Sequence, residues 1–197
     1  MSPAKSKSKT SSARLSSTHD NHPIVLVGMM GAGKTSVGRR LAIQLGRDFL
    51  DSDQEIETAA GMSIADFFAS HGEPDFRVGE TKVIQRLLKQ KNIVLATGGG
   101  AFVNPATREF IKQNAISVWI KAEFDLLFAR VSRKSNRPLL QTANPEQTLK
   151  DLIAARYPIY EDADITIMSR DVPHDTVVNE IITGLNNFTP KNSKPAS

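Results

Sequence analysis

The chain has 197 residues, the length of one ordinary domain, and its 40% hydrophobic and 23% charged residues are typical of a globular protein. It contains no cysteine, which excludes a disulfide scaffold, a thiolate metal site and a cysteine nucleophile. No apolar run approaches the roughly 18 residues of a membrane span. These properties predict a soluble protein with one folded core.

The formal net charge of +4 suggests a nucleic-acid partner, but most of the excess lies in the first 22 residues. That segment contains one acidic residue, Asp20, and the basic residues Lys5, Lys7, Lys9 and Arg14. Because residues 1–22 and 189–197 offer little apolar surface to bury, we expect both to be disordered. A simple cytosolic extension is the favoured interpretation of residues 1–22. An organelle-targeting segment and an interaction arm are the alternatives.

Between these ends, short apolar runs alternate with helical patterns. Strands are predicted at residues 23–27, 47–50, 93–96, 116–120 and 165–168. Helices are predicted at residues 34–45, 63–70, 79–89, 105–113, 123–131, 145–157 and 176–185. Strands that are apolar on both faces and alternate with helices favour a parallel sheet covered on both sides. We therefore expect an α/β domain of three layers over residues 23–188.

A phosphate-binding loop follows the first predicted strand. Its sequence, Gly28-Met-Met-Gly-Ala-Gly-Lys34-Thr35, matches G-x-x-x-x-G-K-[ST] between a strand and a helix. Glycines let backbone N–H groups converge on phosphate, and the helix that follows adds its positive dipole end. Lys34 is expected to reach the β- and γ-phosphates, and the Thr35 hydroxyl to bind Mg²⁺. The expected ATP-binding residues of this loop are Gly28, Met29, Met30, Gly31, Ala32, Gly33, Lys34, Thr35 and Ser36.

The rest of the chain favours a small-molecule kinase over a GTPase. No guanine-reading N-K-x-D sequence follows the strand at residues 116–120. Two carboxylates, Asp51 and Asp53, come directly after the second strand, and on an extended segment they would share one side. One could then reach the metal and the other a substrate hydroxyl. The alternative is that Asp53 only caps a helix that starts near Gln54.

Three further segments could have either a role in binding or catalysis or an ordinary structural role. The triplet Gly98-Gly99-Gly100 ends a strand and permits close backbone approach, although it is also compatible with a flexible connector. The basic residues around Arg137 could close over phosphates, or could form a solvated helix end. Phe76-Arg77 and Arg156 are unremarkable when each is taken alone.

Taken together, however, these segments resemble the shikimate kinase family over about residues 24–185. The resemblance rests on the phosphate loop, Asp51-Ser-Asp53, Gly72-Glu-x-x-Phe-Arg77 with Glu80, Gly98-Gly-Gly100, Arg137-Pro-Leu-Leu140 and Arg156-x-Pro-x-Tyr160. It implies ATP-dependent phosphorylation of the 3-hydroxyl of shikimate, a step of chorismate and aromatic amino-acid biosynthesis. It also implies a five-stranded parallel sheet in the order 2-3-1-4-5.

The same resemblance implies a role for each matching residue. Asp53 would hold the shikimate hydroxyls and act as the base, with Lys34 and Arg137 as the other catalytic residues. The shikimate carboxylate would bind to Arg77 and Arg156 beside the backbone of Gly98, Gly99 and Gly100, with Glu80 supporting the arginines. Mg²⁺ would bind Thr35 directly and Asp51 mainly through water. Adenine would lie between Arg130 and the region of Pro173, and Arg137 would reach the transferred phosphate.

The resemblance also implies a substrate-binding insert at about residues 53–90 and a lid at about residues 132–142. We expect a cytoplasmic monomer that uses ATP, shikimate and Mg²⁺, without a nucleic-acid or membrane partner. The four histidines lack ligand spacing, so no other metal is expected. In one departure, Val78 and Gly79 stand where the family usually has a basic and a bulky apolar residue, which puts substrate affinity in question.

Two alternatives of other kinds stay open on the sequence. A gluconate kinase would share the fold and the phosphate loop, but it is not expected to combine the glycine triplet with Asp51-Ser-Asp53 and Phe76-Arg77. A nucleotide-gated regulator or nucleic-acid-binding protein is disfavoured because Lys34, Thr35 and both aspartates are present. The excess charge also lies in a tail without interleaved aromatic residues.

Overall fold

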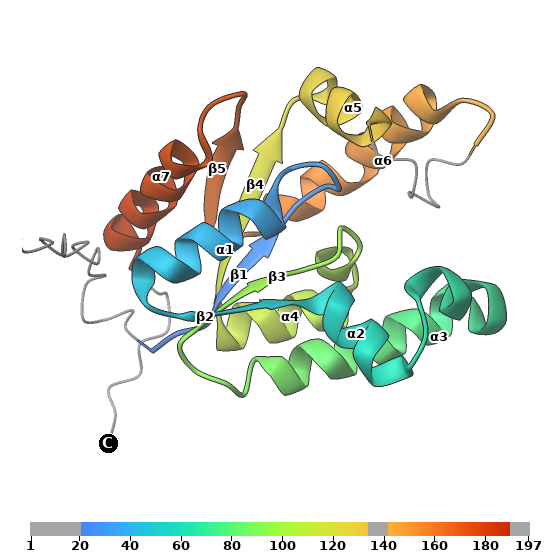
Figure 1. The fold of residues 1–197 in the computed structure, drawn as a ribbon, viewed down its shortest axis with the longest axis horizontal. Helices are drawn as coiled ribbons and strands as arrows, with labels where there is room; N and C mark the ends of the chain where they lie inside the picture. Colours follow the sequence, from blue (N-terminus) through green and yellow to red (C-terminus); the bar gives the residue numbers. More distant parts are fainter. Residues whose placement is uncertain (1–20, 134–141, 190–197) are drawn as a thin grey trace, which may run out of the picture.

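A computed structural model of the chain describes residues 21–133 and 142–189 (Figure 1). Its centre is a parallel sheet of five strands in the order β2-β3-β1-β4-β5, as predicted. The strands are β1 (Ile24–Val27), β2 (Asp48–Asp51), β3 (Ile93–Ala96), β4 (Ile116–Ala122) and β5 (Ile165–Ser169). All neighbouring strands pair in parallel, with Ile24 opposite both Val94 and Ile116. The carboxyl ends of the strands therefore share one edge of the sheet.

Helices cover both faces of the sheet (Figure 1). They are α1 (Lys34–Leu45), α2 (Ser52–Ala60), α3 (Ile64–Leu87), α4 (Pro105–Asn114), α5 (Phe124–Ser132), α6 (Pro145–Tyr160) and α7 (His174–Asn187), with a short 3₁₀ turn at Ala101–Val103. Side-chain hydrogen bonds join helices that lie side by side. Gln44 of α1 bonds Asn179 of α7, and the hydroxyls of Thr81 and Thr107 join α3 to α4.

The hydrophobic core lies between the sheet and these helices. Every residue of β1 and β3 is buried, as their continuous apolar sequences predicted. The largest fully buried side chains include Trp119 of β4, Tyr160 of α6 and Phe102 of the 3₁₀ turn. Apolar residues on both faces of the central strands thus explain why the sheet has two helical layers.

Two helical segments differ from the sequence prediction. The sequence suggested the helix α2 only in the alternative that Asp53 caps a helix starting near Gln54. The helix begins at Ser52, directly after β2, because the Asp51 side chain accepts the N–H of Asp53. The predicted helices at residues 63–70 and 79–89 form one element, α3, which is broken at Gly72 (φ 79°, ψ 174°). Pro74 lies just after this break, where a helix tolerates a missing N–H.

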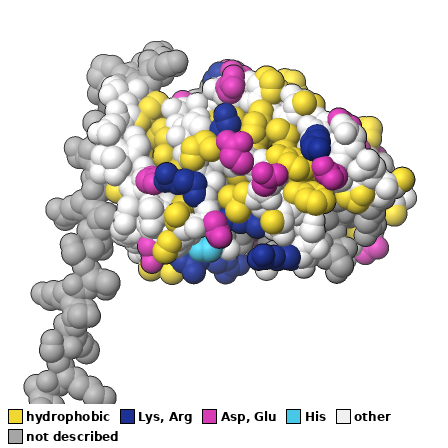
Figure 2. Space-filling view, turned by 90° about the horizontal axis from the view of Figure 1, so that it is seen from above, with side chains coloured by type: hydrophobic (Ala, Val, Ile, Leu, Met, Phe, Trp, Pro, Cys, Tyr) yellow, Lys and Arg dark blue, Asp and Glu magenta, His cyan; other side chains and the backbone are white. Residues whose placement is uncertain are grey.

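Figure 1 shows α2 and α3 on one side of the sheet and α5 with the start of α6 above its carboxyl edge. Among the helices of residues 21–133 and 142–189, none combines the length and hydropathy of a membrane-spanning segment. Figure 2 views the molecule from above the orientation of Figure 1 and shows basic, acidic and hydrophobic side chains intermixed on that face. This pattern differs from the basic stripe that is typical of nucleic-acid-binding domains.

Candidate active site

The phosphate loop, residues 28–35, joins β1 to α1 at the carboxyl edge of the sheet. Gly28, Gly31 and Gly33 have φ angles of 133°, 82° and 99°, which side chains with a β-carbon rarely adopt. A β-carbon at Gly28 would also lie 2.6 Å from the carbonyl oxygen of Ile120 in β4. Backbone conformation therefore requires glycine at all three positions, and packing against β4 requires it at Gly28 as well.

Lys34 begins α1 and is buried under the loop. Its Nζ donates hydrogen bonds to the carbonyl oxygens of Gly28 (2.7 Å) and Met29 (2.9 Å). The loop thus holds the ammonium group at its centre, where it adds positive charge to the N–H groups that the loop presents. Anionic phosphate oxygens bound there would compete with these carbonyls for the ammonium group.

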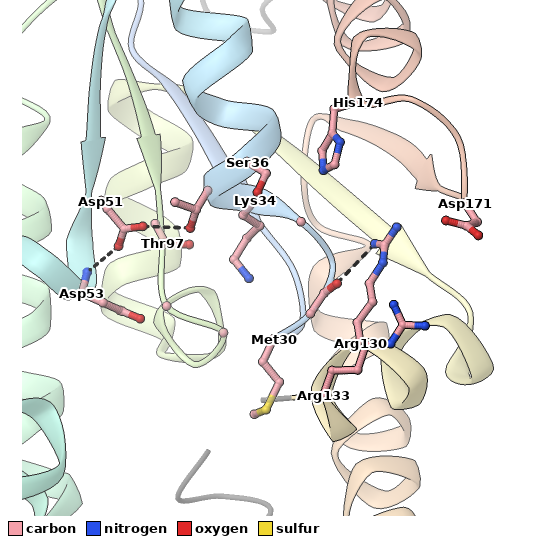
Figure 3. A pocket seen from close by; sticks show the side chains of 15 residues that line it. Met30, Lys34, Ser36, Asp51, Asp53, Thr97, Arg130, Arg133, Asp171 and His174 are labelled. Atoms are coloured by element: carbon pink, nitrogen blue, oxygen red, sulfur yellow. Dashed lines mark hydrogen bonds between the residues drawn. The ribbon is translucent and has the colours of Figure 1, made fainter. Parts of the chain in front are cut away.

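Beside the loop, Thr35 and Asp51 form a hydroxyl–carboxylate pair. Thr35 Oγ1 donates to Asp51 Oδ2 at 2.9 Å, and Asp51 Oδ1 accepts the N–H of Asp53 at 3.1 Å (Figure 3). The expectation that Asp51 and Asp53 lie on one extended segment is wrong, because Asp53 belongs to the first turn of α2. The alternative, that Asp53 caps the helix, is also wrong, because the capping residue is Asp51. Both side chains nevertheless line the same cavity.

That cavity has a volume of about 510 Å³ and runs along the carboxyl edge of the sheet (Figure 3). Its lining residues are Met30, Gly31, Gly33, Lys34, Thr35, Ser36, Asp51, Asp53, Thr97, Gly98, Gly99, Arg130, Arg133, Asp171 and His174. Within the described residues, no three histidine, aspartate or glutamate side chains gather as a metal site. Any divalent cation here would depend on the hydroxyl–carboxylate pair together with phosphate and water oxygens.

The glycine triplet lets two carboxylates approach the end of β3. The position that a β-carbon would take at Gly98 lies 2.6 Å from Asp53 Oδ1 and 3.2 Å from Glu80 Oε1. The N–H of Gly98 also donates to Ser52 Oγ at 3.1 Å. A side chain at residue 98 would displace Asp53. The triplet therefore lets the Asp53 carboxylate lie close to the backbone, which agrees with the close approach predicted there.

Arg77 of α3 lies directly over Gly100. Its guanidinium Nη2 is 2.5 Å from the position of a β-carbon at Gly100. Nη1 bonds the buried Glu80 carboxylate at 2.7 Å, and Nη2 bonds Glu73 at 2.9 Å. Burial by itself would lower the pKa of Arg77, but the two carboxylates outweigh it and raise the pKa. The guanidinium is therefore a fixed and permanent positive charge at this turn.

Glu80 is 1% exposed, and its environment acts in both directions on its pKa. Burial raises the pKa of Glu80, the charge and hydrogen bond of Arg77 lower it, and the carboxylates of Asp53 and Glu73 raise it. The net shift is upward. Asp53, Glu80 and Arg77 therefore form one electrostatically coupled group around Gly98 and Gly100.

Arg156 of α6 approaches the same turn from another direction. Its Nη1 is buried and has no hydrogen-bond partner within the described part of the chain. The same atom lies 3.5 Å from the position of a β-carbon at Gly99. The structure thus brings Arg77 and Arg156 together at the glycine triplet, although 79 residues of sequence separate them. Two guanidinium groups beside backbone N–H groups suit a carboxylate ligand.

Arg130 of α5 lies at the other end of the cavity. Its Nη1 donates to Ser169 Oγ (3.0 Å) and to the carbonyl of Gly31 (3.3 Å), so α5 is tied to the phosphate loop and β5. Pro173 caps α7, and its neighbours Asp171 and His174 line the cavity (Figure 3). Arg137 and most of the expected lid, residues 134–141, lie outside the described residues.

Some residues at this site had no role in the sequence prediction. Ser52, in the middle of the Asp51-Ser-Asp53 motif, accepts the N–H of Gly98. Thr97, directly before the glycine triplet, donates its hydroxyl to the carbonyl of Leu26. Tyr160 donates a hydrogen bond to the carbonyl of Gly99. Tyr160 follows Arg156 by four residues, a spacing that places two side chains on the same face of a helix. This spacing could have identified Tyr160 as a residue of the site. Asp171 and His174 have no comparable signal.

Comparison with known proteins gives a consistent family. A family model for shikimate kinase matches residues 30–186. The shikimate kinase of Rhodopseudomonas palustris is 55% identical over 168 residues, which are 85% of this chain and 83% of that protein. The shikimate kinase of Caulobacter vibrioides is 55% identical over 162 residues, 82% of this chain and 81% of that protein.

Solved structures agree. A shikimate kinase from Acinetobacter baumannii in complex with shikimate has a TM-score of 0.79 and 47% identity, and covers 82% of this chain and 91% of its own. A gluconokinase from Sinorhizobium meliloti has a TM-score of 0.58 and 20% identity, over 83% of this chain and 91% of its own, and therefore shares the fold alone. The chain belongs to the shikimate kinase family.

Proposed function

We propose that the cavity transfers the γ-phosphoryl group of ATP to the 3-hydroxyl of shikimate, with the residues described above in the roles given below. Membership of the family already assigns ATP-dependent phosphorylation of shikimate, a step of aromatic biosynthesis, to the chain. The observation that carries the residue assignment is the convergence of Arg77, Arg156 and Asp53 on Gly98–Gly100, beside the phosphate loop.

The acceptor binds through its two kinds of polar group. Arg77 and Arg156 bind the shikimate carboxylate, for which paired guanidinium donors are well suited. Gly98, Gly99 and Gly100 line the acceptor site, because a β-carbon at 98 or 100 would meet Asp53 or Arg77. Asp53 binds the hydroxyls, and Glu80 holds Arg77 in place through the 2.7 Å ion pair.

The chemical step needs a base and charge neutralisation. Asp53 accepts the proton of the 3-hydroxyl as its oxygen bonds to the γ-phosphorus and the bond from phosphorus to the ADP oxygen breaks. The loop N–H groups and Lys34 bind the negative oxygens during this transfer, which depends mainly on positioning and electrostatics. Arg137, outside the described residues, is assigned to the transferred phosphate by the family resemblance.

Mg²⁺ fits the pair formed by Thr35 and Asp51. The 2.9 Å contact between their side chains lies at the cavity wall beside the phosphate loop, and Mg²⁺ usually takes few protein ligands with phosphate and water oxygens. Thr35 would bind the ion directly and Asp51 mainly through water. When bound, the ion neutralises negative charge on the β- and γ-phosphates.

At the far end of the cavity, adenine lies between Arg130 and the region of Pro173. The hydrogen bonds from Arg130 to Gly31 and Ser169 support this proposal, because they hold the guanidinium beside the loop that binds the phosphates. The insert at residues 53–90 contributes Asp53, Arg77 and Glu80 to the acceptor site. The family resemblance assigns the lid to residues 132–142, most of which lie outside the described part of the chain. The chain acts as a cytoplasmic monomer without nucleic-acid or membrane partners, and light scattering should give the mass of one chain.

The test is ADP release from Mg-ATP in a coupled assay with shikimate, with gluconate and without an acceptor. Shikimate alone should stimulate release strongly. Asp53→Asn should lower kcat by about 10²- to 10⁴-fold, because the base is lost. Asp48→Asn is the matched control, since Asp48 is exposed at the opposite end of β2. Stimulation by gluconate and not by shikimate would contradict the acceptor assignment.

The carboxylate site has its own matched pair on α3. Arg77→Ala should raise the KM for shikimate and leave the KM for ATP nearly unchanged. Arg86→Ala removes an arginine of the same helix whose ion pair with Glu55 (3.0 Å) is exposed, and it should change neither KM. Equal KM values for Arg77→Ala and the unsubstituted protein would contradict a carboxylate-binding role.

A further inference from the structure

Tyr160 is a fully buried polar side chain beside the acceptor site, and it has no role in the proposed reaction. It is 0% exposed, and its ring lies 5.7 Å from Trp119 and 6.5 Å from Phe102 between ring centroids. Its hydroxyl donates to the carbonyl oxygen of Gly99 and lies 3.9 Å from Met29 Sδ. Burial raises the pKa of Tyr160 to about 12, against the opposing effect of the neighbouring Arg156 guanidinium, so the hydroxyl keeps its proton at neutral pH.

This hydrogen bond controls the direction of one peptide unit. The carbonyl of Gly99 and the N–H of Gly100 belong to the same planar group, and the structure has no cis peptide bond in the described residues. In a trans peptide the two groups point in opposite directions. Because Tyr160 holds the carbonyl toward the core, the Gly100 N–H is directed away from the core.

The surroundings of that N–H already favour an anion. Arg77 lies over Gly100 and Arg156 lies beside Gly99. The neighbouring N–H groups of Ala101 and Val103 are occupied within the turn, where they bond the carbonyls of Gly98 (3.2 Å) and Gly100 (3.1 Å). Glycines by themselves would leave this peptide free to rotate, which lowers the effective strength of any bond it makes.

We propose that Tyr160 is a positioning residue that aims the Gly100 N–H at the carboxylate of the acceptor. Tyr160 touches no substrate itself and acts through the Gly99–Gly100 peptide. The proposal rests on the proposed function, because it takes the carboxylate of shikimate as the ligand of this turn. Tyr160 also contacts Met29 of the phosphate loop, so the orienting residue is anchored to the nucleotide side of the cavity.

The chain provides a matched control on the same helix. Tyr157 also donates its hydroxyl to a backbone carbonyl, that of Ala122, and its ring also packs against Trp119, at 5.0 Å between centroids. Tyr157→Phe therefore makes the same chemical change and leaves a carbonyl without its donor, but at the end of β4. Both substitutions should lower thermal stability, because each removes a hydrogen bond inside the protein.

Steady-state kinetics with shikimate and with its methyl ester separates positioning from stability. Tyr160→Phe should lower kcat/KM for shikimate about tenfold while the KM for ATP changes less than about twofold. Because the ester lacks the charged carboxylate, the preference for the acid over the ester should shrink in Tyr160→Phe and persist in Tyr157→Phe. An unchanged preference in Tyr160→Phe would overturn the proposal. If the unsubstituted protein does not turn over shikimate, that result would instead contradict the proposed function.

A second measurement needs no substitution. In amide NMR spectra, shikimate should move the Gly100 N–H proton downfield as it enters a charge-assisted hydrogen bond, and the methyl ester should move it less. Gly61, at the C-terminal end of α2 and with open space around it, provides the reference amide. A Gly100 proton that moves no more than that of Gly61 would overturn the proposal even if Tyr160→Phe did not fold.

Discussion

In the phosphate loop, consecutive residues 28–35 present backbone groups whose direction is set by glycine φ angles. On the acceptor side, the binding groups are side chains from α2, α3 and α6, gathered around Gly98–Gly100 by ion pairs and hydrogen bonds. Substitutions on the two sides of this cavity should therefore have different effects. Damage to the loop should affect the fold, whereas damage to the acceptor side should affect one substrate.

Glycines allow this difference to be tested, because they serve different purposes on the two sides. At Gly28, a β-carbon would meet the backbone oxygen of Ile120 at 2.6 Å, and backbone cannot move aside easily. At Gly100, the atom in the way is the end of the flexible Arg77 side chain at 2.5 Å. Alanine at residue 28 should therefore lower the stability of the fold, whereas alanine at residue 100 should weaken the binding of shikimate.

The largest effect is expected for Gly28→Ala. It adds strain at φ 133° to the contact with Ile120, and it should lower the free energy of unfolding by roughly 3–5 kcal/mol, measured by urea denaturation. Gly61→Ala is the control, because Gly61 has φ 67° with nothing within 4 Å. It should cost only about 1 kcal/mol. Equal losses in the two variants would show that the packing against β4 is unimportant.

Gly100→Ala should instead affect the acceptor. The Arg77 guanidinium has to shift, so we expect the KM for shikimate to rise about tenfold while the KM for ATP stays within about twofold. In an Arg77→Ala background the alanine should have no further effect on KM, because the group that it displaces is gone. Additive effects of the two substitutions would contradict displacement of Arg77 as the cause.

Gly79 sharpens the comparison as a glycine without a structural requirement. It lies within α3, its φ angle is not in the left-handed region, and a β-carbon there would meet nothing within 4 Å. Gly79→Ala should raise the free energy of unfolding by about 0.5–1 kcal/mol, because it removes conformational freedom from the unfolded chain. Thermal unfolding measures this gain. A loss of stability would show that α3 needs the flexibility of glycine at this position.

A final prediction concerns pH, because the charged side chains of the acceptor side should make the free energy of unfolding depend on it. Burial raises the pKa of Glu80 above its ordinary value of 4.5. The native protein therefore binds this proton more tightly than the unfolded chain, so the free energy of unfolding falls as pH rises from 4.5 through the raised pKa. Glu80→Gln should remove that part of the slope in urea denaturation. Glu73→Gln, at the exposed partner of Arg77, should retain most of it, because Glu73 is the smallest of the causes that raise the pKa of Glu80.

Several features could be predicted because their causes lie close together in the chain. The strands β1 and β3 are continuous apolar runs, and both are fully buried. The phosphate loop combines glycines, Lys34 and Thr35 within a few residues, and its φ angles and contacts follow from that order. The strand order and the activity came from the resemblance of the ordered motifs to one family. Apart from the phosphate loop, each motif by itself allowed a plain interpretation.

Two local features of the backbone were not predicted. The cap that Asp51 provides to α2 moved Asp53 from an extended segment into a helix, because a local hydrogen bond outweighed the predicted strand geometry. The joining of the predicted helices at 63–70 and 79–89 depends on the φ of Gly72. Neither the periodicity of apolar residues nor helix propensity contains this information.

By itself, the sequence determined the sheet's apolar strands and the phosphate loop, since hydrophobic runs and adjacent glycines act over short distances along the chain. Tertiary structure decided that Arg77 and Arg156 meet at one turn, that Glu80 lies near Asp53, and that Tyr160 holds Gly99. Those contacts join residues far apart in the chain. They form because α3 and α6 both pack against the 3₁₀ turn at Ala101–Val103, which directly follows the glycine triplet, and this packing fixes where their polar side chains lie.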